Sequence, residues 1–146
     1  MLALLMTMAL AAATVPTAAE RAAIFKAAGF TPTVGKYLMC DGRTPLGLET
    51  RDINGDGRLD ALVLDGGLEC YGSTESGFAL LTRSAAGKWT KLHNSPGIPH
   101  FLKTRANGWP DLEVGGPGFC FPVMRWNGRA YALHRHAYGG KSCRPR

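Results

Sequence analysis

Oxygen-bearing side chains alternate with other residues in the stretch RDINGDGRLDALVLDGG, which covers residues 51–67. Calcium takes about six to eight oxygen ligands, so a chain that wraps the ion directs alternate side chains inward. Gly57 stands where such a loop makes its sharp turn. The turn dipeptides of this stretch also fit a plain hairpin, but a plain turn gains nothing from three mutually repelling carboxylates. The spacing therefore predicts a Ca²⁺ site with these ligands: Asp52, Asn54, Asp56, the carbonyl of Arg58, and Asp60.

The twelfth position of this loop distinguishes it from an EF-hand, because Val63 stands where an EF-hand has a bidentate glutamate. The stretch Arg51–Leu64 instead resembles the DxDxDGxxD loops of integrin-type FG-GAP repeats, in which a β-strand follows the loop. More broadly, the chain is similar to small bacterial periplasmic proteins with such loops, some of which resemble inhibitors of wall-degrading toxins. The resemblance implies a structural calcium ion and a binding role, and it implies no enzymatic activity.

The start of the chain predicts export. Leu2–Ala13 is almost wholly apolar, too short to span a bilayer but suited to the core of a secretory signal. We assign residues 1–19 to a signal peptide region, with cleavage after Ala13 or after Ala19. Residues 20–146 are then expected to form one periplasmic or secreted domain, monomeric and without a membrane span.

Four cysteines follow the predicted signal. An even number of cysteines in an exported chain predicts two disulfides, and no pair here has the close spacing typical of a zinc site. Four cysteines allow three connectivities. We favour the one that joins neighbours within each half of the chain, Cys40 with Cys70 and Cys120 with Cys143.

The remaining pattern predicts a mainly β protein, an antiparallel domain of about seven or eight strands with propeller-blade-like hairpins and one N-terminal helix. Thr17 and Glu20 form a capping box at the start of the helix, and Gly29 ends it. Two segments, GRLDALVLDGG and GWPDLEVGGPG, share a weakly similar pattern of glycine, aspartate and a short apolar run. The strands are expected at Lys36–Cys40, Ala61–Leu64, Phe78–Arg83, Lys88–Leu92, Leu112–Val114, Phe119–Trp126 and Arg129–His136.

Aromatic and arginine side chains gather around Asn127–Gly128, the strongest hairpin signal in the chain. This composition is typical of binding hot spots, although strand alternation buries about half of such residues, so core and partner surface remain alternatives for the aromatic ones. Trp126 and Arg129 are the predicted anchors. The full predicted partner surface is Phe119, Phe121, Arg125, Trp126, Arg129 and Tyr131.

The formal net charge is +6, and no acidic residue follows Glu113. Such a surface favours an acidic protein partner or an anionic envelope component over nucleic acid in an exported protein. No nucleophile elbow and no HExxH motif occurs in the sequence. We therefore expect a calcium- and disulfide-stabilised, non-enzymatic binding module, such as an inhibitor or immunity protein against a cell-wall hydrolase. The alternative is a small hydrolase of cell-envelope polymers.

Overall fold

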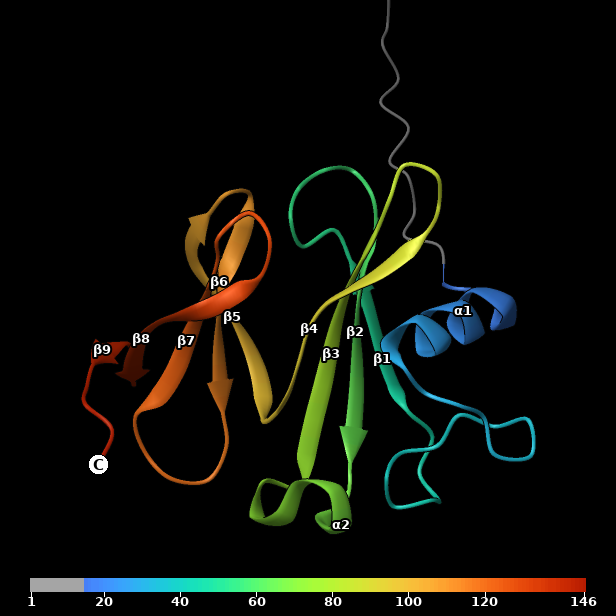
Figure 1. Ribbon diagram of the computed structural model, residues 1–146, viewed down its shortest axis with the longest axis horizontal. Coiled ribbons are helices and arrows are strands. Elements are labelled where there is room, and N and C mark those ends of the chain that lie inside the picture. The colour runs from blue at the N-terminus through green and yellow to red at the C-terminus, as the bar shows by residue number, and fades with distance from the viewer. Residues whose placement is uncertain (1–14) are drawn as a thin grey trace, which may run out of the picture.

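The computed structural model describes residues 15–146, and the predicted signal segment Leu2–Ala13 lies outside the described residues. The chain forms a helix, four strands with two short helical turns between them, and five further strands (Figure 1). In chain order these are α1 (Ala18–Ala28), β1 (Gly47–Arg51), β2 (Asp60–Gly66), α2 (Leu68–Tyr71), η1 (Gly72–Thr74), β3 (Ser76–Arg83), β4 (Trp89–Pro96), β5 (Ile98–Ala106), β6 (Trp109–Gly115), β7 (Phe121–Trp126), β8 (Tyr131–Tyr138) and β9 (Lys141–Ser142).

Two antiparallel sheets make up the fold, and each follows the order of the chain. The first sheet has the order β1-β2-β3-β4, and the second has the order β5-β6-β7-β8-β9. In Figure 1 the sheets stand side by side, with α1 on the far side of the first sheet. The predicted mainly β, antiparallel architecture with an N-terminal helix is confirmed, with nine strands in place of seven or eight.

Successive side chains of β2 and β3 point to opposite faces of the first sheet, and both faces are buried. Leu62 and Leu80 pack toward the second sheet, against a cluster that includes Leu112 and Trp109. The intervening residues, such as Val63, pack on the other face under α1. A strand that is buried on both faces has a continuous apolar sequence, and the apolar run Ala61–Leu64 therefore predicted a central strand.

Helix α1 forms where the sequence predicted it. The hydroxyl of Thr17 accepts a hydrogen bond from the amide of Glu20 at 3.2 Å, and the Glu20 carboxylate accepts one from the Thr17 amide at 2.8 Å. Gly29 ends the helix with φ 100°, in the left-handed region that suits glycine. The helix buries Ile24 and Phe25 against the first sheet.

One strand prediction was wrong, and three strands, β1, β5 and β9, were missed. Lys36–Cys40 forms only isolated bridges, such as that between Leu38 and Pro45. The strands β1 and β5 carry no clear sequence signal, because each lies at a sheet edge. Edge strands tolerate charges and proline, and β5 contains Pro99 among basic residues.

Both predicted disulfides are present. Cys40 is bonded to Cys70 with a Cα–Cα distance of 6.2 Å, and Cys120 is bonded to Cys143 with a Cα–Cα distance of 5.7 Å. The first ties the segment before β1 to α2, and the second ties the start of β7 to the C-terminal segment. None of the helices within residues 15–146 has the length and apolar character needed to cross a membrane.

Candidate functional site

The acidic loop, residues 52–60, joins β1 to β2 and closes around the carboxylate of Asp52. One oxygen of Asp52 accepts a hydrogen bond from the amide of Gly55 at 2.8 Å, and the other accepts one from the amide of Gly57 at 2.8 Å. Both glycines have positive φ, 77° and 83°, which glycine adopts without the steric cost that other residues incur. The loop therefore owes its curvature to Gly55 and to Gly57, the glycine that the calcium pattern places at the sharp turn.

Asn54 and Asp56 lie together in this loop. The carboxamide of Asn54 donates to Oδ2 of Asp56 at 3.3 Å, and the guanidinium of Arg58 lies 3.1 Å from the same oxygen. The amide of Arg58 donates to Oδ1 of Asp56 at 2.8 Å, and this hydrogen bond is the main cause that lowers the pKa of Asp56. Asp56 is thus held in its ionised form.

Asp60 is the buried end of the acidic loop. Its Oδ2 accepts a hydrogen bond from the amide of Ile53 at 2.8 Å, and its Oδ1 accepts one from the hydroxyl of Thr82 at 2.7 Å. The side chain is fully buried, and this burial raises the pKa of Asp60. Asp60 therefore holds the loop to β3.

The donor chemistry of the loop is of the kind that calcium prefers, namely carboxylate, carboxamide and carbonyl oxygens. A carboxylate offers about four acceptor sites, so Asp52 and Asp56 keep some capacity beyond the amides they already bind. Asp60 also accepts three hydrogen bonds, but its side chain is fully buried, so it can become a ligand only if the loop moves. Within residues 15–146, no three histidine, cysteine, aspartate or glutamate side chains converge into a metal-binding group.

Arg105 connects the acidic loop to the second sheet. Its guanidinium donates to the carbonyl of Ile53 at 3.1 Å and to the carbonyl of Gly108 at 2.8 Å. The side chain of Ile53 belongs to the core between the two sheets. The position of the loop is therefore coupled to the packing of one sheet on the other.

The predicted anchor Trp126 and the predicted surface residue Tyr131 both lie in the core, so their assignment to a partner surface was wrong. The exposed fraction of Trp126 is 9%, and that of Tyr131 is 5%. The two residues are cross-strand neighbours on β7 and β8, so both side chains leave the hairpin on the same face, toward the first sheet. Their ring centroids lie 5.4 Å apart, and the Tyr131 hydroxyl donates to the carbonyl of Pro110 at 2.8 Å.

Arg125 also makes its contacts within the protein. Its Nε and one terminal nitrogen donate to the two carboxylate oxygens of Asp111 at 2.9 and 2.8 Å. The hydroxyl of Thr104 donates to Asp111 as well, at 2.6 Å. Asp111 is fully buried, and the hydrogen bonds from Arg125 lower its pKa. Arg125 therefore neutralises a buried acid, while Arg129 remains exposed in the turn.

An exposed aromatic group lies at the other end of the hairpin. Phe119 and Tyr138 are 51% and 49% exposed, and their ring centroids lie 5.0 Å apart. Phe121 lies 5.8 Å from the Tyr138 ring, and the guanidinium of Arg146 lies 6.0 Å from the centroid of Phe119. We call these four residues the C-terminal patch.

Two residues of the C-terminal patch, Tyr138 and Arg146, were missed from the sequence. They are far from Phe119 along the chain. Tyr138 comes beside it because β8 pairs with β7, with Phe121 opposite Ala137, and Arg146 comes beside it because Cys143 is bonded to Cys120, which follows Phe119 directly. The favoured disulfide pairing was thus a signal that could have placed the C-terminal residues near Phe119.

Comparison of the chain with family models, with curated proteins and with solved structures gave no match.

Proposed function

We propose that the protein is an exported, non-enzymatic binding module that holds an acidic protein partner on the C-terminal patch. The observation that carries this proposal is the exposure of about half of Phe119 and half of Tyr138 beside an arginine. Aromatic residues and arginine are the types enriched in binding hot spots. Large aromatic side chains exposed in contact with one another are typical of an interaction site.

Charge supports an acidic partner. Residues 76–146 contain eleven basic and two acidic side chains, and both acidic ones precede the patch in the chain. Lys141 and Arg144 are exposed in the same C-terminal segment as Arg146. A surface of one sign attracts a partner of the opposite sign and speeds association, an effect that salt weakens.

The patch also has the rigidity that a binding site needs. The Cys120–Cys143 disulfide joins both chain segments that form it, and β9 pairs with the end of β8. A surface held in place before binding loses little conformational entropy when a partner docks. The partner class that we propose is a cell-wall hydrolase, with this protein as its periplasmic inhibitor.

The test uses the patch variant Phe119→Ala with Arg146→Ala. We expect wild type immobilised on resin to retain an acidic wall hydrolase from periplasmic extract, and the purified hydrolase to lose its lytic activity when bound. The patch variant should bind this hydrolase at least about tenfold more weakly, since hot-spot truncations cost about 2 kcal/mol or more. Calorimetric titration measures the Kd of each form.

Arg129→Ala is the matched control, because Arg129 is exposed on the same hairpin but lies in the turn at its opposite end. It should bind as wild type does. Equal affinity of the patch variant and wild type for the hydrolase would contradict the proposal. A captured hydrolase that keeps its full activity in the complex would contradict the inhibitory role.

We further propose that the acidic loop binds one calcium ion that stabilises the fold. Asp52, Asn54, Asp56 and the carbonyl of Arg58 would hold it, with Asp60 as a fifth ligand after the loop moves to bring its buried side chain to the ion. A bound divalent cation would offset the repulsion between the carboxylates of the loop. Through Arg105, a stabilised loop would also stabilise the contact between the sheets.

Calcium is expected to raise the unfolding temperature of wild type. A ligand that binds only the folded state adds about 2.7 kcal/mol when its concentration is 100 times its Kd. Asp56→Asn should remove this effect, and Glu69→Gln, which neutralises an exposed acid outside the loop, should leave it unchanged. Differential scanning calorimetry with calcium and with a chelator measures the shift. Identical curves for wild type in both conditions, together with no heat of calcium binding, would refute the calcium site.

A further inference from the structure

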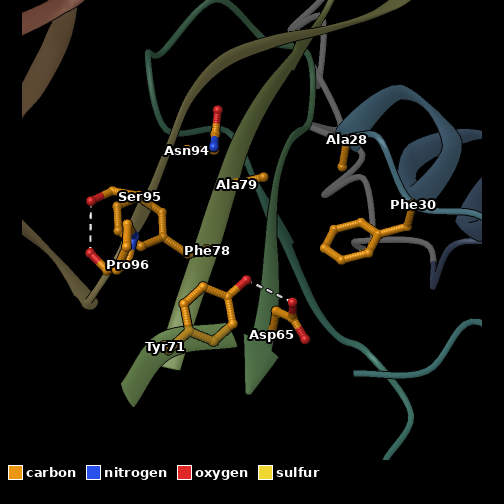
Figure 2. Close-up of a pocket in the computed structure, with 9 residues that line it drawn as sticks. All are labelled: Ala28, Phe30, Asp65, Tyr71, Phe78, Ala79, Asn94, Ser95 and Pro96. Atoms are coloured by element: carbon orange, nitrogen blue, oxygen red, sulfur yellow. Dashed lines mark hydrogen bonds between the residues drawn. The ribbon is translucent and has the colours of Figure 1, made fainter. Parts of the chain in front are cut away.

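A small cavity of about 110 Å³ lies at the end of the first sheet, away from the C-terminal patch. The end of α1, helix α2 and the strands β2 to β4 surround it (Figure 2). The rings of Phe30 and Tyr71 line it, together with the carboxylate of Asp65 and the carboxamide of Asn94, whereas the ring of Phe78 points to the opposite face of the sheet. The cavity therefore combines aromatic rings with a few polar groups at fixed positions, as is typical of ligand sites.

Asp65 brings a negative charge to this cavity without a cation to balance it. The side chain is only 8% exposed. Its Oδ1 accepts hydrogen bonds from the amides of Cys40 at 2.7 Å and Gly66 at 2.8 Å, and its Oδ2 accepts one from the Tyr71 hydroxyl at 2.6 Å. All three donors are neutral, and no basic side chain of residues 15–146 lies within 4.0 Å of this carboxylate. A buried charge of this kind is stabilised further by a counter-ion.

Tyr71 is fixed in position by the backbone of β3. A side chain at residue 77 would collide with the Tyr71 ring, so the ring lies directly on Gly77. Burial, and then the neighbouring Asp65, raises the pKa of Tyr71, so the phenol keeps its proton and donates a hydrogen bond to the carboxylate. The hydroxyl and the ring therefore present a constant surface to the cavity.

We propose that this cavity binds the ammonium end of an alkylammonium ligand. The Asp65 carboxylate would pair with the ammonium group, and the carbonyl oxygen of Asn94 would accept one of its hydrogen bonds. The rings of Phe30 and Tyr71 would contact the adjoining methylene groups and attract the cation through their faces.

The test compares propylammonium with 1-propanol, which has the same chain length and no charge. In ¹H–¹⁵N spectra of the full protein, propylammonium should shift the amide signals of Gly66 and Gly77 and the side-chain signal of Asn94. The alcohol should leave these signals in place at the same concentration. Equal shifts with both compounds would overturn the proposal, because the charge of the ligand would then have no role.

Two variants test the assigned contacts. Asp65→Asn removes the charge, and a charge-assisted hydrogen bond is worth about 1.5–3 kcal/mol, so propylammonium should bind about tenfold more weakly or worse. Because Asp65 also binds the amides of Cys40 and Gly66, that variant could fail to fold. Asn94→Leu leaves Asp65 in place and fills part of the cavity, and Asn94 lies exposed on the edge strand β4. It should weaken binding to a similar degree, and unchanged affinity in Asn94→Leu would overturn the proposal.

Two sources of the ammonium group are distinguished by a further titration. Nα-acetyl-lysine methylamide presents the same group on a longer chain with a peptide backbone. Shifts at Gly66 and Gly77 with this compound would identify the side chain of a lysine as the ligand. Shifts with propylammonium alone would identify a free small amine, and the absence of shifts with both compounds would refute the site.

Discussion

Trp126→Ala is expected to reduce the free energy of unfolding by about 3–5 kcal/mol, as truncation of a buried large aromatic residue does. The Trp126 ring lies between Trp109 and Tyr131, at centroid distances of 5.9 and 5.4 Å. Its main-chain carbonyl also accepts a hydrogen bond from the side chain of Asn107 at 3.0 Å. Removal of the indole leaves a cavity beside the contact between the two sheets, where no flexible surface group can fill it.

Phe119→Ala is the matched control for this prediction. It removes a side chain of similar size near the start of the same hairpin, but one that is 51% exposed. We expect its effect on the free energy of unfolding to be within about 1 kcal/mol, since surface substitutions are usually small. Chemical denaturation followed by tryptophan fluorescence measures both variants. A smaller loss for Trp126→Ala than for Phe119→Ala would show that the indole does not support the contact between the sheets.

Elements that are determined by residues close together in the chain could be predicted from the sequence. The capping box of Thr17 and Glu20 fixes the start of α1 through hydrogen bonds three residues apart, so the sequence alone contains both partners. The Asn127–Gly128 turn is similar, because its geometry requires positive φ at Gly128, which is 96°. The apolar run of β2 follows from burial on both faces, which gives a continuous pattern.

Elements that depend on distant partners were harder to predict. The strands β1 and β5 each have one unpaired edge, so selection for an apolar pattern is weak there. Whether Trp126 was core or surface depended on which face of the hairpin the first sheet covers, and strand alternation cannot decide this. The hydrogen bonds from Arg125 to Asp111 likewise depend on the pairing of β6 with β7.

The small cavity beside Asp65 illustrates the same limit. Its lining comes from α1, α2 and three strands, and no motif in the sequence joins these segments. The acidic loop is the opposite case, because all its polar groups lie within residues 52–60. Its composition was evident from the sequence, while the inward turn of Asp60 toward Thr82 was not, since Thr82 lies on another strand.

The two disulfides should be equivalent for stability but not for binding. Loop-closure entropy predicts a loss of about 3–4 kcal/mol for either bond, because the bonded cysteines are separated by similar lengths, 30 and 23 residues. We compare Cys40→Ser with Cys70→Ser against Cys120→Ser with Cys143→Ser. Denaturant unfolding should give losses of similar size for the two double variants.

Only the second pair of substitutions should release the C-terminal segment. Apart from the disulfide, this segment is held by the short strand β9 and by one hydrogen bond from the Cys143 amide to the His136 carbonyl, at 3.2 Å. Without the disulfide, trypsin should cleave faster after Lys141, which is exposed. The Cys40/Cys70 variant should keep the wild-type cleavage rate at this site under conditions in which it remains folded.

Release of this segment should also weaken the binding that we propose for the C-terminal patch. The patch would then have to order Arg146 when the partner docks, at about 0.5–1.5 kcal/mol for this side chain, which corresponds to about two- to tenfold in Kd. The Cys40/Cys70 variant should bind the hydrolase as wild type does, because its bond lies on the first sheet, whereas the patch is formed by the second sheet and the C-terminal segment. Equal weakening in both variants would mean that binding follows global stability alone. Full binding by the Cys120/Cys143 variant, despite faster cleavage of its C-terminal segment, would place the contact surface elsewhere.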